Sequence, residues 1–253
     1  MKKKFLIIFF GIGRGGEVAK RFYEKKFDEG FSFFHAYLDQ EYVQNKRSGE
    51  SFNVRKARVL LSSDVLKINE SDFQGLFEEL SPEMLFDIYD DGLSSITNLL
   101  RQLFIIDQVC KNLPPGFDRF VFIRDDTVTD FNIEMLKRLD HWTEDRPRIL
   151  LPISHWHGGV CDRFFVVNHT GLELFSKRLG HAVGMLFNKP ISSESIFQNF
   201  LAEFGYVLSS CPVKVRRIRS GAHVIEDRYR FPFHRPNELL RIFAALVRFI
   251  FGR

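Results

Sequence analysis

Short runs of apolar residues alternate along this chain with segments in which apolar residues recur every three or four positions. Every residue from position 5 to position 10 is apolar, and the run ends at glycines. Such a run is typical of a strand that is buried on both faces of a parallel sheet. The clearest helix is predicted over residues 94–112, where apolar residues recur at helical spacing until Pro114 and Pro115 end it.

The other predicted elements continue this alternation. Strands are expected over residues 31–38, 58–62, 119–124, 149–152, 163–168 and 213–219, helices over residues 17–26, 170–179 and 192–204, and a polar loop over residues 40–56. Strands that alternate with helices predict the α/β class, with a mainly parallel central sheet flanked by helices. No internal repeat or linker divides the chain, so residues 1–235 are expected to form one domain.

The composition narrows the class of protein. Of the 253 residues, 45% are hydrophobic and 27% are charged, which is enough for a sizeable core and excludes a disordered chain. Lys and Arg number 36 against 32 Asp and Glu, and this balance, without blocks of like charge, predicts no nucleic-acid partner. The three cysteines are widely spaced without a C-x-x-C pair, which fits a cytoplasmic protein better than a zinc ribbon or a secreted disulfide scaffold.

Two segments bear on membranes. The lysines and apolar run at the start imitate a signal peptide, but the run is shorter than the apolar region of such peptides and is better explained as a strand. No stretch reaches the ~18 apolar residues that suggest a membrane-spanning helix. Residues 236–253 predict an amphipathic helix with basic residues beside a broad apolar face. That helix either lies on an anionic membrane surface or docks on the protein's own core.

The turn after the first strand has the pattern G-x-G-x-x-G between Gly11 and Gly16. The second predicted strand closes on Asp39, near where the ribose-binding acid of a dinucleotide site would lie. The glycines would let a pyrophosphate approach the start of the next helix. The alternative is a tight strand-to-helix turn with no ligand.

A second candidate is Arg124-Asp125-Asp126, at the carboxyl end of the most hydrophobic predicted strand. Ligand sites in open α/β sheets lie outside the carboxyl ends of strands. Two adjacent acids there suit a hard divalent cation that bridges a diphosphate. The alternative is a solvated turn in which Asp126 or Thr127 caps a following helix.

A third candidate is the segment H-W-H-G-G-V-C-D-R-F at residues 155–164. Its paired glycines, Gly158 and Gly159, let the backbone approach a ligand. Asp162 and Arg163 then place opposite charges at the start of a strand. The two histidines of the segment have no second pair of zinc ligands with them, so a structural or sugar-facing role is favoured over a metal site.

Two further residues have both a structural and a chemical interpretation. Glu194 begins a predicted helix, where a carboxylate either stabilises the helix dipole or projects into the site as a general base. His223 follows a basic strand, and a lone histidine is more often structural unless acids elsewhere already create a metal site.

Taken together and in order, these segments resemble bacterial GT-A-type glycosyltransferases of capsule and lipopolysaccharide (O-antigen) biosynthesis. The similar pieces are the glycine-to-arginine turn Gly11–Arg14, the strand ending at Asp39, a helix with Gln102, the strand 117–126, the segment 158–164 and Glu194. Two departures are Cys161, where the family usually has Asn, and Arg-Asp-Asp in place of a strict D-x-D.

The resemblance implies a GT-A-like fold, with a Rossmann-like nucleotide-binding half over residues 1–130 and an acceptor half over residues 131–235. It also implies a nucleotide-sugar donor, expected to be a UDP-sugar. It implies that Asp126 and His223 hold Mn²⁺ or Mg²⁺ on the diphosphate. The acceptor would be a glycan or lipid-linked glycan, with possible contact of the protein with the inner membrane. The donor-binding residues would be Gly11, Arg14, Asp39, Arg124, Asp125, Gly158 and Gly159.

The chemistry of transfer requires two kinds of residue. The leaving nucleoside diphosphate develops negative charge, which a cation or Arg14 and Arg124 would stabilise. An acceptor hydroxyl needs a carboxylate to take its proton, and we expect Glu194 in that role with Asp162 as the second candidate. A placed base favours inversion of the anomeric configuration. The alternatives are an NAD(P)-binding Rossmann-type oxidoreductase that uses the turn between Gly11 and Gly16, and a non-catalytic sugar- or nucleotide-binding module.

Overall fold

The structure is a computed structural model, and it describes residues 4–12, 16–27, 31–39, 42–45, 50–53, 64–86, 90–153, 159–188, 191–219 and 223–225. At its centre is a seven-stranded sheet. In spatial order its strands are β10 (Val207–Cys211), β8 (Arg148–Pro152), β9 (Phe164–Asn168), β6 (Arg119–Arg124), β1 (Phe5–Gly11), β2 (Ser32–Asp39) and β5 (Val65–Asn69). Only β9 runs antiparallel to its neighbours in this sheet. The predicted α/β class with a mainly parallel central sheet is therefore confirmed.

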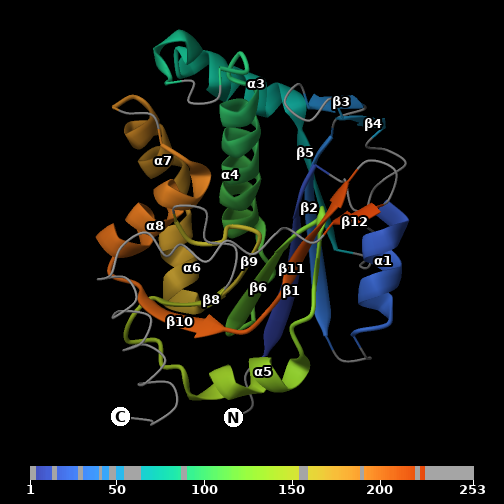
Figure 1. Cartoon of the computed structure of the whole chain (residues 1–253). Coiled ribbons are helices and arrows are strands. Elements are labelled where there is room, and N and C mark those ends of the chain that lie inside the picture. The colour runs from blue at the N-terminus through green and yellow to red at the C-terminus, as the bar shows by residue number, and fades with distance from the viewer. Residues whose placement is uncertain are drawn as a thin grey trace, which may run out of the picture.

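Helices cover one face of this sheet, and a mixed layer covers the other (Figure 1). The first face carries α3 (Glu70–Glu79), α4 (Ser94–Asn112), α6 (His169–Phe175), α7 (Arg178–Leu186) and α8 (Ser193–Glu203). The second carries α1 (Gly16–Glu24), α5 (Ile133–Lys137), η2 (Arg138–His141) and the strands β7 (Thr127–Thr129) and β11 (Val215–Arg219). These two strands and β12 (His223–Ile225) form a small three-stranded sheet. The remaining elements are the hairpin β3 (Tyr42–Asn45) and β4 (Glu50–Asn53) and the short η1 (Pro82–Met84).

Two hydrophobic cores follow from the alternation of side chains along each strand. In β1, Leu6, Ile8 and Phe10 point into the core beneath the helices, whereas Ile7 and Phe9 point into the core beneath α1 and the small sheet. All five side chains are buried. This burial on both faces explains why the strand reads as an unbroken apolar run rather than as an alternating one.

Several predicted boundaries need correction. The polar loop predicted over residues 40–56 contains the antiparallel hairpin β3–β4. The helix predicted over residues 170–179 divides into α6 and α7, because α6 packs on the sheet whereas α7 packs on α4 and α8. The alternative in which a helix follows Asp126 is wrong, since β7 follows and pairs with β11. The predicted strand 58–62 and terminal helix 236–253 lie outside the described residues. Within those residues, no helix combines the length and apolar character needed to cross a membrane.

Candidate functional site

The carboxyl ends of the parallel strands meet at one edge of the sheet, where the order of connections reverses. From β1 the chain proceeds to β2 and β5 on one side, and it then returns to β6 on the other side of β1. Phe10 of β1 pairs in register with Arg124 of β6. In open α/β sheets, ligands bind in the crevice at such a switch point. The predicted residues around Gly11 and Asp125 therefore lie where the topology places a ligand.

Asp125 closes onto Gly11 at this point. Its backbone N–H donates to the carbonyl oxygen of Phe10 at 2.9 Å, and its side chain is buried. Gly11 has φ +146°, and a Cβ placed on it would lie 2.4 Å from Oδ1 of Asp125. Both the backbone conformation and the space over Cα therefore require glycine at position 11.

Arg124 and Asp126 form a two-point ion pair beside this contact. Nε of Arg124 lies 2.5 Å from Oδ1 of Asp126, and Nη2 lies 3.1 Å from Oδ2. The side chains are only 18% and 10% exposed. Burial alone would lower the pKa of Arg124, but the attraction of Asp126, then of Asp162 and Asp125, raises it above the ordinary value. Arg124 is thus a fixed cation among three acids.

Asp162 reaches the same edge because β9 runs antiparallel. Ile123 of β6 pairs with Phe164, so the residues that precede β9 lie beside the end of β6. The backbone N–H of Arg124 donates to the carbonyl oxygen of Arg163 at 2.9 Å, which extends this pairing. Asp162 is buried, and its Oδ2 lies 3.5 Å from Nε2 of Gln102 on α4.

Glu194 is brought to the site by close packing of α8 against Gly159. The backbone N–H of Val160 donates to the carbonyl oxygen of Glu194 at 3.2 Å. A Cβ on Gly159 would lie 2.1 Å from that same oxygen. The side-chain oxygen of Ser192 accepts from the N–H of Ser195 at 3.2 Å and caps the helix. Gly159 therefore positions Glu194 by permitting backbone contact.

Burial and the charge of Asp162 both act on the carboxyl group of Glu194. Burial, and next the negative charge of Asp162, raise the pKa of Glu194 above its ordinary value. Opposing contributions come from hydrogen bonds, including that from Oγ of Ser193 to Oε2 at 2.9 Å, and from Arg163. A carboxyl group with a raised pKa accepts and releases protons closer to neutral pH, as general acid–base catalysis requires.

The other predicted residues are placed to different extents. Asp39 ends β2 at the same sheet edge, and its carboxylate pairs with Nζ of Lys67 at 2.7 Å. His223 begins β12 and pairs in register with Arg219 of β11, while the N–H of Ile218 in β11 donates to the carbonyl oxygen of Asp126 at 2.7 Å. The backbone of His223 is thus one strand away from Asp126. Its side chain lies outside the described part, as do Arg14, Gly158 and the two histidines of the segment 155–164.

The carboxylates at this edge are suitable ligands for a divalent cation, but Asp126 is already paired with Arg124. Within the described ranges, no group of three or more His, Cys, Asp or Glu side chains is placed to hold a metal ion. A Mg²⁺ ion at a diphosphate is usually held by one or two carboxylates and by phosphate oxygens, so Asp125 and Asp126 are a sufficient protein contribution. Asp126 would have to share its oxygens between the cation and Arg124.

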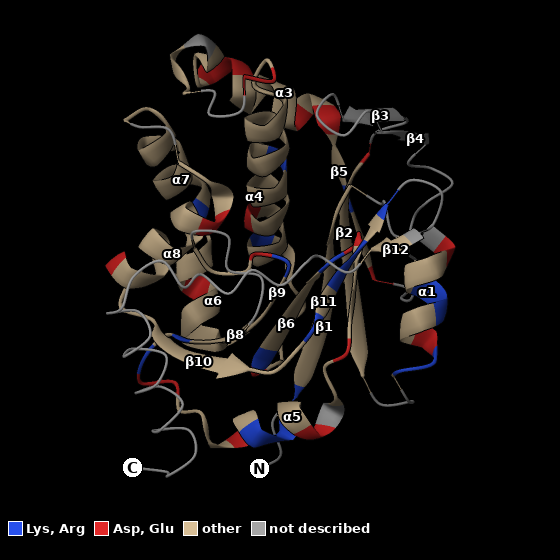
Figure 2. Cartoon of the chain, viewed as in Figure 1, with Lys and Arg blue, Asp and Glu red and all other residues tan. Residues whose placement is uncertain are grey.

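The basic strand predicted over residues 213–219 contains β11 and lies next to the turn that contains Asp126, with Arg216, Arg217 and Arg219 along it (Figure 2). Arg178 was not predicted as part of the site. It lies at the start of α7, is almost completely buried and is attracted by Asp162. No sequence pattern distinguishes a buried arginine in a helix from an exposed one.

Comparison with known proteins gave weak structural matches only. No model of a protein family matches the chain, and no curated protein sequence matches it. Among solved structures it is similar to mouse xyloside xylosyltransferase 1 (12% identity, 83% of this chain, 85% of that chain, TM-score 0.45). It is also similar to the glycosyltransferase GlyE of Streptococcus pneumoniae TIGR4 (13% identity, 82% of this chain, 46% of that chain, TM-score 0.47).

A further similar structure is a glycosyltransferase involved in the glycosylation of the major capsid of PBCV-1 (10% identity, 82% of each chain, TM-score 0.44). The chain therefore spans less than half of GlyE but most of the other two proteins. Identity and TM-score are low for all three proteins.

Proposed function

We propose that this chain is a glycosyltransferase that moves a sugar from a nucleotide-sugar donor, a UDP-sugar, to a hydroxyl group of a glycan or lipid-linked glycan. The observation that carries the proposal is the continuity of charged groups across the site. Asp126 pairs with Arg124, Arg124 is attracted by Asp162, and Asp162 raises the pKa of Glu194. A group that balances a diphosphate and a group that accepts a proton are thus coupled within one site, as sugar transfer requires.

The donor would bind at the switch point between β1 and β6. Gly11 and Asp125 close this point, Arg124 supplies positive charge, and Asp39 ends the neighbouring strand. Arg14 and the glycines at 158 and 159 complete the proposed donor site. Asp126 and His223 would hold Mn²⁺ or Mg²⁺, which when bound neutralises charge on the diphosphate leaving group.

Glu194 would act on the acceptor. Its carboxylate removes the proton from the acceptor hydroxyl, the hydroxyl oxygen bonds to the anomeric carbon, and the bond from that carbon to the diphosphate oxygen breaks. The proton stays on Glu194 and the bonding electrons leave with the nucleoside diphosphate, so attack from the opposite side inverts the anomeric configuration. The raised pKa of Glu194 matches this role, because a stronger base takes a hydroxyl proton more readily.

No observation favours the oxidoreductase alternative. A dinucleotide pyrophosphate approaches the glycine turn and the helix start by favourable electrostatics. Here the Asp125 carboxylate lies over Gly11, the first glycine of the turn. A negative group at that position opposes an anion unless a divalent cation lies between them, as is proposed here for the nucleotide-sugar donor and not for a dinucleotide. Asp39, the candidate ribose-binding acid, is paired with Lys67.

The setting is proposed from the sequence resemblance. We place the enzyme in bacterial capsule or lipopolysaccharide synthesis. Contact with the cytoplasmic face of the inner membrane would bring it close to a lipid-linked acceptor. Residues 236–253 are the candidate contact. Sedimentation of the full chain and of a variant lacking residues 237–253 with anionic liposomes tests this. Equal binding by the two proteins would rule out that role for the segment.

Binding and turnover together test the proposed function. UDP and UDP-sugars, each with Mn²⁺, should raise the melting temperature, whereas NAD(H) should not. Release of UDP from the matching donor and acceptor should fall by about 10²–10⁴ in Glu194→Gln, with donor binding nearly unchanged. Stabilisation by NAD(H) but not by UDP-sugars would instead support the oxidoreductase alternative.

A further inference from the structure

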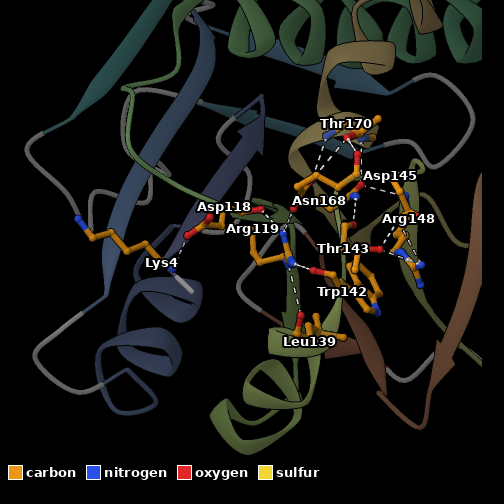
Figure 3. A network of polar contacts seen from close by, with 12 residues as sticks. Lys4, Asp118, Arg119, Leu139, Trp142, Thr143, Asp145, Arg148, Asn168 and Thr170 are labelled. Atoms are coloured by element: carbon orange, nitrogen blue, oxygen red, sulfur yellow. Dashed lines mark hydrogen bonds and ion pairs between the residues drawn. The ribbon is translucent and has the colours of Figure 1, made fainter. Parts of the chain in front are cut away.

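Two arginines of the described chain, Arg119 and Arg178, are almost completely buried, with 0% and 1% of their surfaces exposed. Arg119 lies at the start of β6, at the sheet edge opposite the candidate site. Figure 3 shows the polar network around it. Its guanidinium donates to the carbonyl oxygens of Leu139, Asp118 and Trp142 and pairs with the carboxylate of Glu144. Arg119 is therefore a satisfied structural cation that ties η2 and the following loop to the sheet.

Arg178 has no comparable set of partners. In the described structure its Nε and Nη1 are buried without a hydrogen-bond acceptor. The guanidinium instead stacks 3.7 Å from the ring centre of Phe197, with Phe175 at 5.7 Å and Phe165 at 5.9 Å. Cation–π attraction offsets part of the lost hydration but satisfies no N–H group. A buried arginine in this state lowers stability relative to a hydrophobic residue of similar size.

The position of Arg178 links it to the two candidate catalytic carboxylates. Phe197 lies three residues after Glu194 on α8, one helical turn away. Phe165 lies on β9, just after Asp162. The guanidinium is thus in contact with the helix that carries Glu194 and with the strand that Asp162 precedes.

The charge environment of Arg178 points to Asp162. Burial lowers the pKa of Arg178 to about 10, and the attraction of Asp162 is the largest opposing effect. The two other groups that attract it are Tyr206 and Cys110. Burial raises the pKa of both, to about 12 for Cys110, so both are neutral at pH 7. At that pH the attraction on Arg178 therefore comes from Asp162 and not from Tyr206 or Cys110.

We propose that Arg178 is a positioning residue of the site, which holds α8 and β9, and with them Glu194 and Asp162, in one arrangement at the expense of overall stability. This inference rests on the proposed roles of Glu194 and Asp162. A buried charge with unsatisfied donors is explained better by the specificity of one arrangement than by stability, because a hydrophobic side chain would fill the same space with less desolvation.

Three variants test the proposal: Arg178→Met, Arg178→Lys and, as the matched control, Arg119→Met. Arg178→Met should unfold at a urea concentration no lower than the wild type. Arg119→Met should unfold at a clearly lower urea concentration. It leaves the carbonyl oxygens that Arg119 binds, and the carboxylate of Glu144, without their donor. The comparison separates a residue that serves the site from one that serves the fold.

Local exchange and kinetics supply the second readout. The amide hydrogen of Val160 bonds to the carbonyl oxygen of Glu194 at 3.2 Å, so its exchange reports whether the segment before β9 remains fixed to α8. Arg178→Met should exchange this hydrogen about 10-fold faster or more, at unchanged global stability. The kcat of transfer should fall about 10–100-fold with the donor KM nearly unchanged, and Arg178→Lys should recover part of the loss.

Three results would overturn the proposal: a urea midpoint for Arg178→Met as low as that of Arg119→Met, an unchanged exchange rate at Val160, or a normal kcat. If the wild-type protein transfers no sugar from any donor, the proposed function fails. The exchange rate at Val160 and the urea midpoints still decide whether Arg178 holds α8 against β9.

Discussion

The carbonyl oxygen of Glu194 lies against the Cα of Gly159, so closely that a Cβ on Gly159 would be 2.1 Å from it. The same oxygen accepts the N–H of Val160 at 3.2 Å. The start of α8 is therefore seated on a stretch of backbone without a side chain. This contact explains why position 159 requires glycine.

Gly159→Ala should displace the first turn of α8 and move Glu194 out of place. The new methyl group would meet backbone atoms of Glu194 and Ser195, which cannot rotate away. We expect a loss of about 1–3 kcal/mol in the free energy of unfolding, typical of overpacking. Activity should fall further than stability, because the base is misplaced. Urea unfolding and initial rates measure the two effects.

Gly180→Ala is the matched control for this change. Gly180 lies within α7, and no heavy atom is within 4 Å of a Cβ placed there. Alanine in the interior of a helix should raise the free energy of unfolding by about 0.5–1 kcal/mol and leave activity unchanged. If Gly159→Ala behaved like Gly180→Ala, the packing of α8 on Gly159 would not position Glu194.

The central strands could be predicted from the sequence, whereas the edge strands could not. β1, β6 and β9 are buried along nearly their whole length, and each appears in the sequence as an apolar run. β5 and β10 form the two edges of the sheet and are mostly exposed or half-buried, so the run of apolar residues is lost. The signal used to find strands is burial on both faces, and edge strands lack it.

The candidate site was predictable to the extent that acids and glycines follow strands. Asp125, Asp162 and Glu194 were identified because each lies at the start or end of a predicted element, and the structure brings Asp162 and Glu194 into electrostatic contact. The pairing of Arg124 with Asp126 and the burial of Arg178 depend on side-chain directions, which residue spacing does not specify.

Gly11→Ala should weaken both the fold and the donor site. A φ of +146° is unfavourable for alanine, and the methyl group would fall on the carboxylate of Asp125. Backbone strain of this kind costs of order 1–3 kcal/mol. We expect a lower melting temperature and a loss of UDP affinity, measured by calorimetry. The control is Gly75→Ala in α3, where a Cβ meets no atom within 4 Å. Unchanged UDP affinity in Gly11→Ala would argue against donor binding at this turn.

Glu194 should give the protein a characteristic dependence of stability on pH. Burial and Asp162 raise its folded-state pKa above the ordinary value of 4.5, so the folded protein binds a proton more tightly than the unfolded chain. This contribution is fully present below the unfolded pKa and is lost as pH rises through the folded pKa. Glu194→Gln does not titrate, so its stability relative to the wild type should increase across that pH window. Parallel pH curves for the two proteins would contradict the raised pKa.

Asp126→Asn separates the structural role of this residue from its proposed role in cation binding. An acid at a strand end is expected to contribute little to packing, but Asp126 holds Arg124 through two contacts at 10% exposure. Loss of the Asp126 carboxylate should lower the free energy of unfolding by about 2–3 kcal/mol. This is below the ~3–5 kcal/mol expected for a fully buried pair, because solvent reaches both groups. Glu134→Gln, which breaks an exposed pair with Lys137, is the control and should cost at most about 1 kcal/mol.

Calorimetric titration of UDP with Mn²⁺ should then show cation-dependent binding in the wild type and in Glu134→Gln but not in Asp126→Asn. EDTA should abolish turnover until Mn²⁺ is restored. Full activity of Asp126→Asn in EDTA would instead assign the diphosphate charge to Arg124 and the basic residues of β11.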